Sequence, residues 1–167
     1  MRLLVGALAL SAVVSTAVRS EELRNWFGDP YFQVRSGIPN CPVPLGPHMT
    51  EHQMVTESHP RAERGTRCWL EKKCAKPSAY LYDPGIAQAV HSRFESTDRF
   101  RETSLWVTVQ RRFVWIEGCV RSKRAQAELE ELVRDIADVE QVIVLISEGV
   151  PATPAYRAFP SPAPRPR

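Results

Sequence analysis

Between residues 83 and 147 the spacing of apolar positions changes several times, and each spacing indicates a different element of secondary structure. Asp83 followed by Pro84 has the form of a helix cap with proline at the first helical position. The apolar residues that follow recur at helical spacing: Ile86, Ala89, Val90 and Phe94. Two alternating apolar runs come next, at 105–109 and 113–116, with a short polar turn between them. This part of the sequence predicts a helix and then a β-hairpin.

A second helix and a last strand are predicted after the hairpin. Gly118 ends the second run, and the next apolar residues again have helical spacing: Ala125, Leu129, Leu132, Val133 and Ile136. The run 142–146 is wholly apolar and predicts a buried strand. The order helix, strand, strand, helix, strand indicates an α+β fold.

This order resembles the BON domain, a small module of bacterial envelope proteins. The family pattern has alternating apolar residues in the hairpin, then a glycine, a serine before the second helix, and a Val-x-x-Val start to the last strand. The matching residues are Val107, Val109, Val114, Ile116, Gly118, Val120, Ser122, Val139 and Val142. The sequence departs from the pattern at Arg111 and Arg112, where the family usually has a glycine-containing turn, and at Asp138, where glycine is common. The resemblance implies a BON-like αββαβ module, in which a three-stranded mixed sheet carries two helices on one face.

Composition divides the rest of the chain. Residues 1–17 have the form of a cleavable signal peptide, with a retained membrane anchor as the alternative. Residues 18–82 form an irregular, cysteine-containing N-terminal extension, and 83–147 form the BON-like domain. Residues 148–167 contain six prolines and predict a disordered tail, either a solvated end or a ligand for a partner.

The extension shows one clear helix signal. Thr50 and Gln53 have the spacing of a capping box, which predicts a helix from about Glu51. Pro60 is expected to kink or end this helix, and Gly65 would suit the C-terminal end of any continuation.

Four cysteines in a chain that we expect to be exported indicate two disulfides: Cys41, Cys68, Cys74 and Cys119. Three pairings are possible, and we favour Cys68 with Cys74 and Cys41 with Cys119. Because Cys119 lies in the BON-like segment and the other three precede it, any disulfide from Cys119 ties the extension to the domain.

The predicted hairpin places a large apolar patch on one side of the sheet. If Arg111 and Arg112 form a two-residue turn, the four aliphatic residues of the pattern share the core face. The opposite face then presents Trp106, Thr108, Phe113 and Trp115. Such a patch is too large to leave bare. We favour the interpretation that the extension covers it, tethered through Cys119; the alternative is that it docks a partner or lipid.

The sequence offers no evident catalytic or metal site. It contains no nucleophile elbow, no C-x-x-C pair and no phosphate-binding glycine loop, so we predict that the protein is not an enzyme. His48, His52 and His59 lack the paired spacing of zinc ligands, so no metal or cofactor is expected. Glu117 is a single carboxylate without an evident partner. The net charge is +3 and no segment has a dense basic stripe, which argues against nucleic-acid binding.

The resemblance implies a non-catalytic periplasmic protein that binds phospholipid or an envelope protein and supports envelope integrity under stress. In some BON proteins a helix of the module is implicated in contacting anionic phospholipid; the corresponding segment here carries charges of both signs. The candidate binding surface consists of Trp106, Phe113, Trp115, Arg93, Arg99 and Arg101. The first alternative is a structural subunit that assembles through its sheet, and a second is a redox or metal-handling protein that uses the cysteines. The sequence leaves the oligomeric state open.

Overall fold

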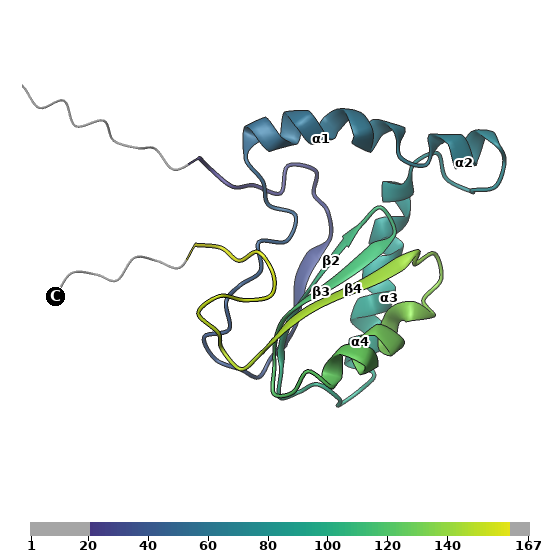
Figure 1. Cartoon of the computed structure of the whole chain (residues 1–167). Coiled ribbons are helices and arrows are strands. Elements are labelled where there is room, and N and C mark those ends of the chain that lie inside the picture. The colour runs from purple at the N-terminus through teal and green to yellow at the C-terminus, as the bar shows by residue number, and fades with distance from the viewer. Residues whose placement is uncertain (1–20, 161–167) are drawn as a thin grey trace, which may run out of the picture.

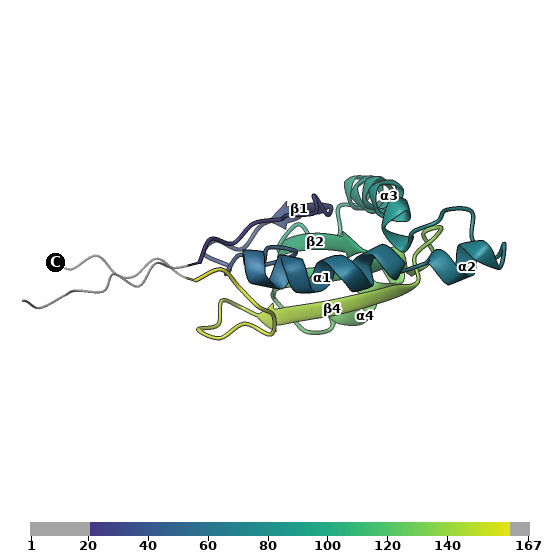
Figure 2. The same cartoon turned by 90° about the horizontal axis from the view of Figure 1, so that it is seen from above.

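The computed structural model describes residues 21–160, and a four-stranded sheet lies at its centre (Figures 1 and 2). Neighbouring strands follow the order of the chain: β1 (Tyr31–Ser36), β2 (Ser104–Gln110), β3 (Phe113–Val120) and β4 (Gln141–Glu148). The first three strands are antiparallel, and β4 runs parallel to β3. Helices α3 (Asp83–Glu95) and α4 (Ala125–Arg134) pack on one face of the sheet. The predicted order of helix, strand, strand, helix and strand is confirmed, and the fold is α+β.

The sheet has one strand more than the three we expected. Strand β1 comes from the N-terminal extension and pairs with the edge of β2 that the hairpin leaves free, with Phe32 opposite Val107. Phe32 and Val34 also pack against the core between the sheet and the helices. The extension is therefore part of the fold that carries the core, although its pattern did not predict a strand.

The core lies between the sheet and the two helices. Val107 pairs with Ile116 and Val109 with Val114, as the two-residue turn predicted, and all four side chains are fully buried. The helices contribute side chains that are equally buried: Val90 and Phe94 from α3, and Leu129 and Val133 from α4. The spacing of the aliphatic residues alone thus predicts which side chains form the core between the sheet and the two helices.

An aspartate from α3 holds the hairpin turn. Arg111 and Arg112 both have positive φ, at 49° and 68°, a conformation that hairpin turns usually assign to Asn and Gly. The Asp83 carboxylate accepts hydrogen bonds from the backbone N–H groups of Arg111 (2.7 Å) and Arg112 (2.8 Å). We expected Asp83 to cap its own helix, but Tyr82 occupies the cap position. The carboxylate instead supports the two-residue turn in which glycine is absent.

Three helical elements complete the extension: α1 (Glu51–Glu63), α2 (Thr66–Leu70) and the 3-10 helix η1 (Ala79–Tyr82). The capping box of Thr50 and Gln53 is confirmed, and Gly65, with φ of 97°, follows the end of α1. Pro60 does not end α1, which continues to Glu63. The next residue, Arg61, pairs with Asp29 and lies over the rings of Phe27 and Tyr80, which holds this last turn in place.

The disulfides join Cys41 to Cys119 and Cys68 to Cys74, the pairing that we favoured. The first of them ties the extension to strand β3.

The C-terminal segment is ordered over 149–160, where we expected disorder. Tyr156 is buried and its hydroxyl donates to the Pro42 carbonyl (2.7 Å), while Pro44 and Ala158 form an isolated β-bridge. One buried aromatic side chain thus anchors a proline-rich segment. The expected signal peptide at 1–17 and the end of the tail at 161–167 lie outside the described residues. Within the described range, every helix is too short or too polar to cross a membrane.

Candidate functional site

The face of the sheet opposite α3 and α4, here called the open face, is only partly covered. The extension covers Trp106, which is buried beside the Cys41–Cys119 disulfide together with Tyr31 and Ile38. Phe113 and Trp115 are half-buried, with ring centroids 5.7 Å apart. The guanidinium of Arg111 lies over both rings, 5.0 Å from the Phe113 centroid and 6.0 Å from that of Trp115. The aromatic patch is therefore divided into a covered half and an accessible half.

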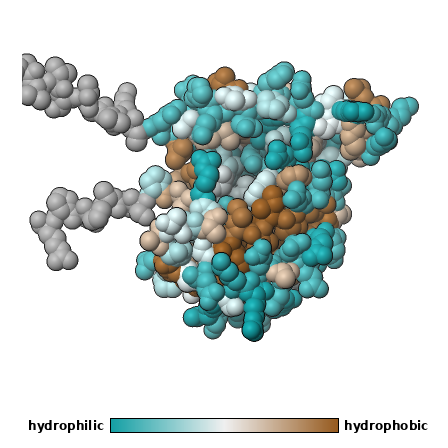
Figure 3. Space-filling model, viewed as in Figure 1, coloured by the Kyte–Doolittle hydropathy of each residue, from teal (hydrophilic) through white to brown (hydrophobic). Residues whose placement is uncertain are grey.

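The accessible half lies in a groove. Helix α1 and the loop before it form one side, and the segment 154–157 forms the other. The groove consists of two adjoining cavities of about 480 Å³ and 430 Å³, which share Gly46, Gln110 and Arg157. Figure 3 shows the hollow between α1 and an apolar band that follows β4.

Glu117 of β3 lies in this groove without a partner. Its side chain is nearly enclosed, with 8% of the residue exposed. Burial raises the pKa of Glu117 to about 7, and the charge of Arg157 opposes this rise. The nearby hydroxyls of Tyr31 and Tyr156 donate instead to the backbone carbonyls of Pro44 (2.6 Å) and Pro42 (2.7 Å). Within residues 21–160 no hydrogen bond or ion pair reaches the Glu117 carboxylate.

A second unpartnered polar group lies beside Glu117. The hydroxyl of Thr108 on β2 is buried and has no hydrogen-bond partner in the described part of the chain. Thr108 is opposite Trp115, and Glu117 is two residues farther along β3, so the two side chains are diagonal neighbours on the same face. The loop at Gly46, with φ of 54°, comes so close that an added Cβ would lie 3.2 Å from the Thr108 hydroxyl oxygen. Within the described residues, the Glu117 carboxylate and the Thr108 hydroxyl thus both lack a hydrogen-bond partner, and the Thr108 oxygen is sealed from the groove.

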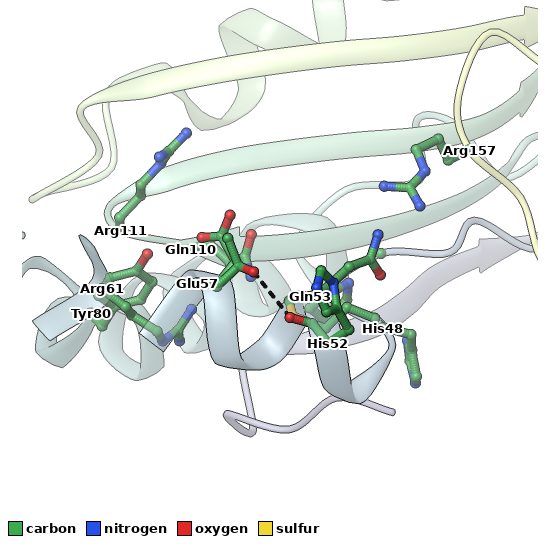
Figure 4. A pocket seen from close by; sticks show the side chains of 13 residues that line it. His48, His52, Gln53, Glu57, Arg61, Tyr80, Gln110, Arg111 and Arg157 are labelled. Carbon is green, nitrogen blue, oxygen red and sulfur yellow. Dashed lines mark hydrogen bonds between the residues drawn. The ribbon is translucent and has the colours of Figure 1, made fainter. Parts of the chain in front are cut away.

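Polar and charged side chains surround the outer part of the groove (Figure 4). His52, Gln53 and Glu57 project from α1, while Arg111 and Arg157 extend from the hairpin and the C-terminal segment. Neither of these two arginines forms an ion pair within the described residues. Both cations are therefore available at the rim.

The histidines considered as metal ligands are placed apart. His48 lies between the rings of Tyr31 and Phe159, and its Nδ1 is 2.9 Å from the Leu45 carbonyl. His52 and His59 are exposed on α1. Over residues 21–160 no three His, Cys, Asp or Glu residues form a cluster that could hold a metal ion.

The structure separates the surface residues selected from the sequence. Trp115 lines the groove, Phe113 packs beside Trp115, and Trp106 is covered, whereas the arginines lie on or beside α3. Each of those arginines pairs with a carboxylate, Arg93 with Asp135, Arg99 with Glu128 and Arg101 with Asp98. The sequence analysis did not select Glu117, Thr108 or Arg157. For the first two a signal was present, since both have the parity of the open face in strands whose other residues are largely apolar.

A module with two helices on one face of a mixed sheet, and a groove on the other, belongs to the class of small α+β domains. Residues 82–148 match the model of the BON domain family, so this part of the chain is a BON domain. The match differs by one residue at each end from the range predicted for the domain. No curated protein and no solved structure matches the chain. BON domains are associated with membrane or envelope interactions and are generally non-catalytic, and the disulfides suggest an oxidising compartment.

Proposed function

We propose that this protein is exported to the periplasm and binds phospholipid at the membrane surface, without catalysis, in support of envelope integrity. The observation that carries the proposal is the accessible half of the open face. There an apolar band along β4 lies beside two arginines that have no ion-pair partner in the described chain (Figure 3).

The chemistry of this surface suits the boundary between headgroups and acyl chains. Ile143 and Leu145 of β4 are half-exposed and share the open face with Trp115. Apolar side chains of this kind enter the acyl boundary, and an indole ring favours the interface itself. The guanidiniums of Arg111 and Arg157 are suited to phosphate groups, which they bind through paired N–H donors.

The helix side is a weaker candidate for the same role. Arg93, Arg99 and Arg101 are each accompanied by a carboxylate at the surface. An exposed ion pair of this type contributes little to stability, and its acidic member repels anionic lipid. The rival surfaces therefore differ in whether their cations are already paired.

Vesicle co-sedimentation of the oxidised chain, residues 18–167, tests the proposal with anionic and neutral phospholipids at low and moderate salt. We expect salt-sensitive binding to anionic vesicles, because surface cations add about 1 kcal/mol each near such a membrane. Replacing Arg111 and Arg157 together with Glu is expected to reduce the partition coefficient at least about tenfold. The matched control replaces Arg93 and Arg101 with Glu and is expected to have a smaller effect. Absence of binding at both salt concentrations contradicts lipid recognition and leaves an envelope protein as the partner.

A second candidate function is assembly through the sheet, because β4 lies at its edge. This strand contains five consecutive apolar residues, 142–146, and pairs only with β3 in the described chain. Free strand edges of this kind are suited to pairing with another chain. Sedimentation velocity without vesicles distinguishes the two functions. A lipid-binding protein stays monomeric with increasing concentration, whereas an assembly subunit forms oligomers that Ile143→Lys is expected to weaken.

A further inference from the structure

Within residues 21–160 the Glu117 carboxylate in the groove receives no hydrogen bond and forms no ion pair. A carboxylate buried without a hydrogen-bond donor is unfavourable. Three hydroxyl groups come close to Glu117 or line the same groove, yet two donate to proline carbonyls and the third, on Thr108, is fully buried and has no partner in the described chain. A ligand that donates hydrogen bonds and carries a positive charge would compensate the carboxylate.

We propose that the groove binds the primary ammonium of an ethanolamine headgroup, with Glu117 as the acceptor and Arg157 as the partner of the headgroup phosphate. This inference rests on the proposed phospholipid binding and deepens it by naming the headgroup. A primary ammonium has three N–H donors and can donate to both oxygens of the Glu117 carboxylate.

The same chemistry discriminates between headgroups. A choline ammonium has the charge but no N–H, so it cannot donate to Glu117. A glycerol headgroup has hydroxyl donors but no charge to compensate the carboxylate. The ring of Trp115, which lines the cavity beside Glu117, adds a cation–π surface that suits an ammonium. An ethanolamine headgroup alone among these three supplies both the charge and the donors.

Two groups of the groove suit the polar end of such a lipid. Glu117 is nearly enclosed at the floor and Arg157 is exposed at the rim, while Leu145 of the apolar β4 band pairs with Glu117 and lines the same cavity. An ethanolamine phospholipid has its ammonium at the tip and its phosphate next. A headgroup that enters ammonium first places its ammonium at Glu117 and its phosphate at Arg157.

Binding is expected to depend on pH through Glu117. The charged and titratable groups that face it are Arg157, Tyr31 and Tyr156, and burial raises the pKa of both tyrosines to about 12, so they stay neutral near pH 7. Arg111 and Glu57 lie farther out along the groove. Because the alkyl ammonium stays protonated in this range, affinity should follow ionisation of Glu117 and rise about tenfold from pH 6 to pH 8.

Isothermal titration calorimetry of the oxidised chain with glycerophosphoethanolamine and glycerophosphocholine provides the first test. We expect glycerophosphoethanolamine to bind more tightly, and Glu117→Gln to weaken it at least about tenfold, because an ionic hydrogen bond is lost. Glu131→Gln makes the same chemical change on α4 and should leave the affinity unchanged. Equal affinity for the two compounds, or an unaffected Glu117→Gln protein, overturns the inference. If Glu117→Gln does not fold, the preference of the unmodified protein for one of the two compounds decides.

Vesicles distinguish this inference from the proposed function. Phosphatidylcholine vesicles with and without phosphatidylethanolamine are compared, using the unmodified chain and Glu117→Gln. A preference for phosphatidylethanolamine that Glu117→Gln removes supports both proposals. Vesicle binding that depends neither on the headgroup nor on Glu117 supports the proposed lipid binding and contradicts the ammonium site. The protein could instead bind glycerophosphoethanolamine but no vesicle, not even an anionic one. This result would support the ammonium site, with a free small molecule as the ligand, and would contradict membrane binding.

Discussion

Successive residues of the β2–β3 hairpin point to opposite faces of the sheet, and the two faces bury different kinds of side chain. On the helix side, Val107, Val109, Val114 and Ile116 are aliphatic and fully buried. On the open face the residues between them include a threonine and a glutamate that are also buried but lack hydrogen-bond partners in the described chain. Burial therefore stabilises the fold on the helix side and destabilises it at the polar groups of the open face.

The difference can be expressed in free energy. Burying an aliphatic side chain contributes about 1.5–3 kcal/mol, whereas an unsatisfied buried polar group costs about 1–3 kcal/mol. The helix face thus supplies the stability that lets the open face retain polar groups. Local conflicts of this kind tend to mark functional sites in otherwise consistent folds, and this supports placing the ligand in the groove.

The largest expected effect comes from releasing the cover of the open face. Replacing Cys41 and Cys119 with Ala removes a cross-link between residues 78 apart in the sequence, and chain entropy predicts a loss of about 4 kcal/mol. The same change at Cys68 and Cys74, only 6 apart, is expected to cost about 2 kcal/mol. Urea unfolding measures both. Binding of a fluorescent apolar dye should increase only for the first variant, because only that one uncovers Trp106. Equal losses of unfolding free energy in the two variants, without dye binding, would contradict the conclusion that the extension covers Trp106.

Neighbouring residues on β3 test the two faces directly. Ile116→Ala leaves a cavity in the core and should cost about 3 kcal/mol, within the range for large-to-small core changes. Trp115→Ala, although it removes more atoms, should cost only about 1 kcal/mol because its side chain is half-exposed. Urea unfolding gives both values. A loss at Trp115 as large as that at Ile116 would show that the open face also stabilises the fold.

The pH dependence of stability isolates Glu117. Burial raises its pKa from 4.5 to about 7, so the folded state binds more protons than the unfolded state between these values. Its contribution is complete below pH 4.5 and is lost as the pH rises through 7, which amounts to about 2 kcal/mol between pH 5 and pH 7. Asp83, whose pKa burial raises to about 6, acts in the same direction. Glu117→Gln should therefore flatten the decline in unfolding free energy without abolishing it. An unchanged slope would mean that Glu117 is ionised throughout.

The sequence predicted the domain better than its surroundings. The core register followed from the alternation of apolar residues, which is a local signal, and the disulfide of Cys119 correctly indicated a covered Trp106. Strand β1 was missed because its partner in β2 lies about 70 residues away and the run Tyr31–Ser36 mixes polar and apolar residues. Order in the proline-rich segment was missed because it depends on contacts with a loop more than 100 residues earlier, namely the hydrogen bond from buried Tyr156 to Pro42 and the bridge between Pro44 and Ala158.

The groove was harder to predict for a related reason. The positions of Glu117 and Thr108 on the open face follow from strand parity, and Trp115 was selected on this basis. That their polar atoms lack partners is a property of the assembled site, since it depends on Tyr31 and Tyr156 donating elsewhere. Sequence patterns report which side chains share a face but not which hydrogen bonds they form.

The smallest effect, and the sharpest comparison, involves two buried threonines. Thr108→Val removes a hydroxyl without a partner in the described chain and should raise the unfolding free energy by about 1 kcal/mol. Thr103→Val is the matched control, because its hydroxyl donates to the Phe100 carbonyl at 2.6 Å and its loss should destabilise by about 1 kcal/mol. Urea unfolding of both variants at one pH measures the contrast. Opposite signs would show that the fold gains nothing from the Thr108 hydroxyl. Destabilisation by both variants would instead show that the Thr108 hydroxyl has a structural partner in the folded protein.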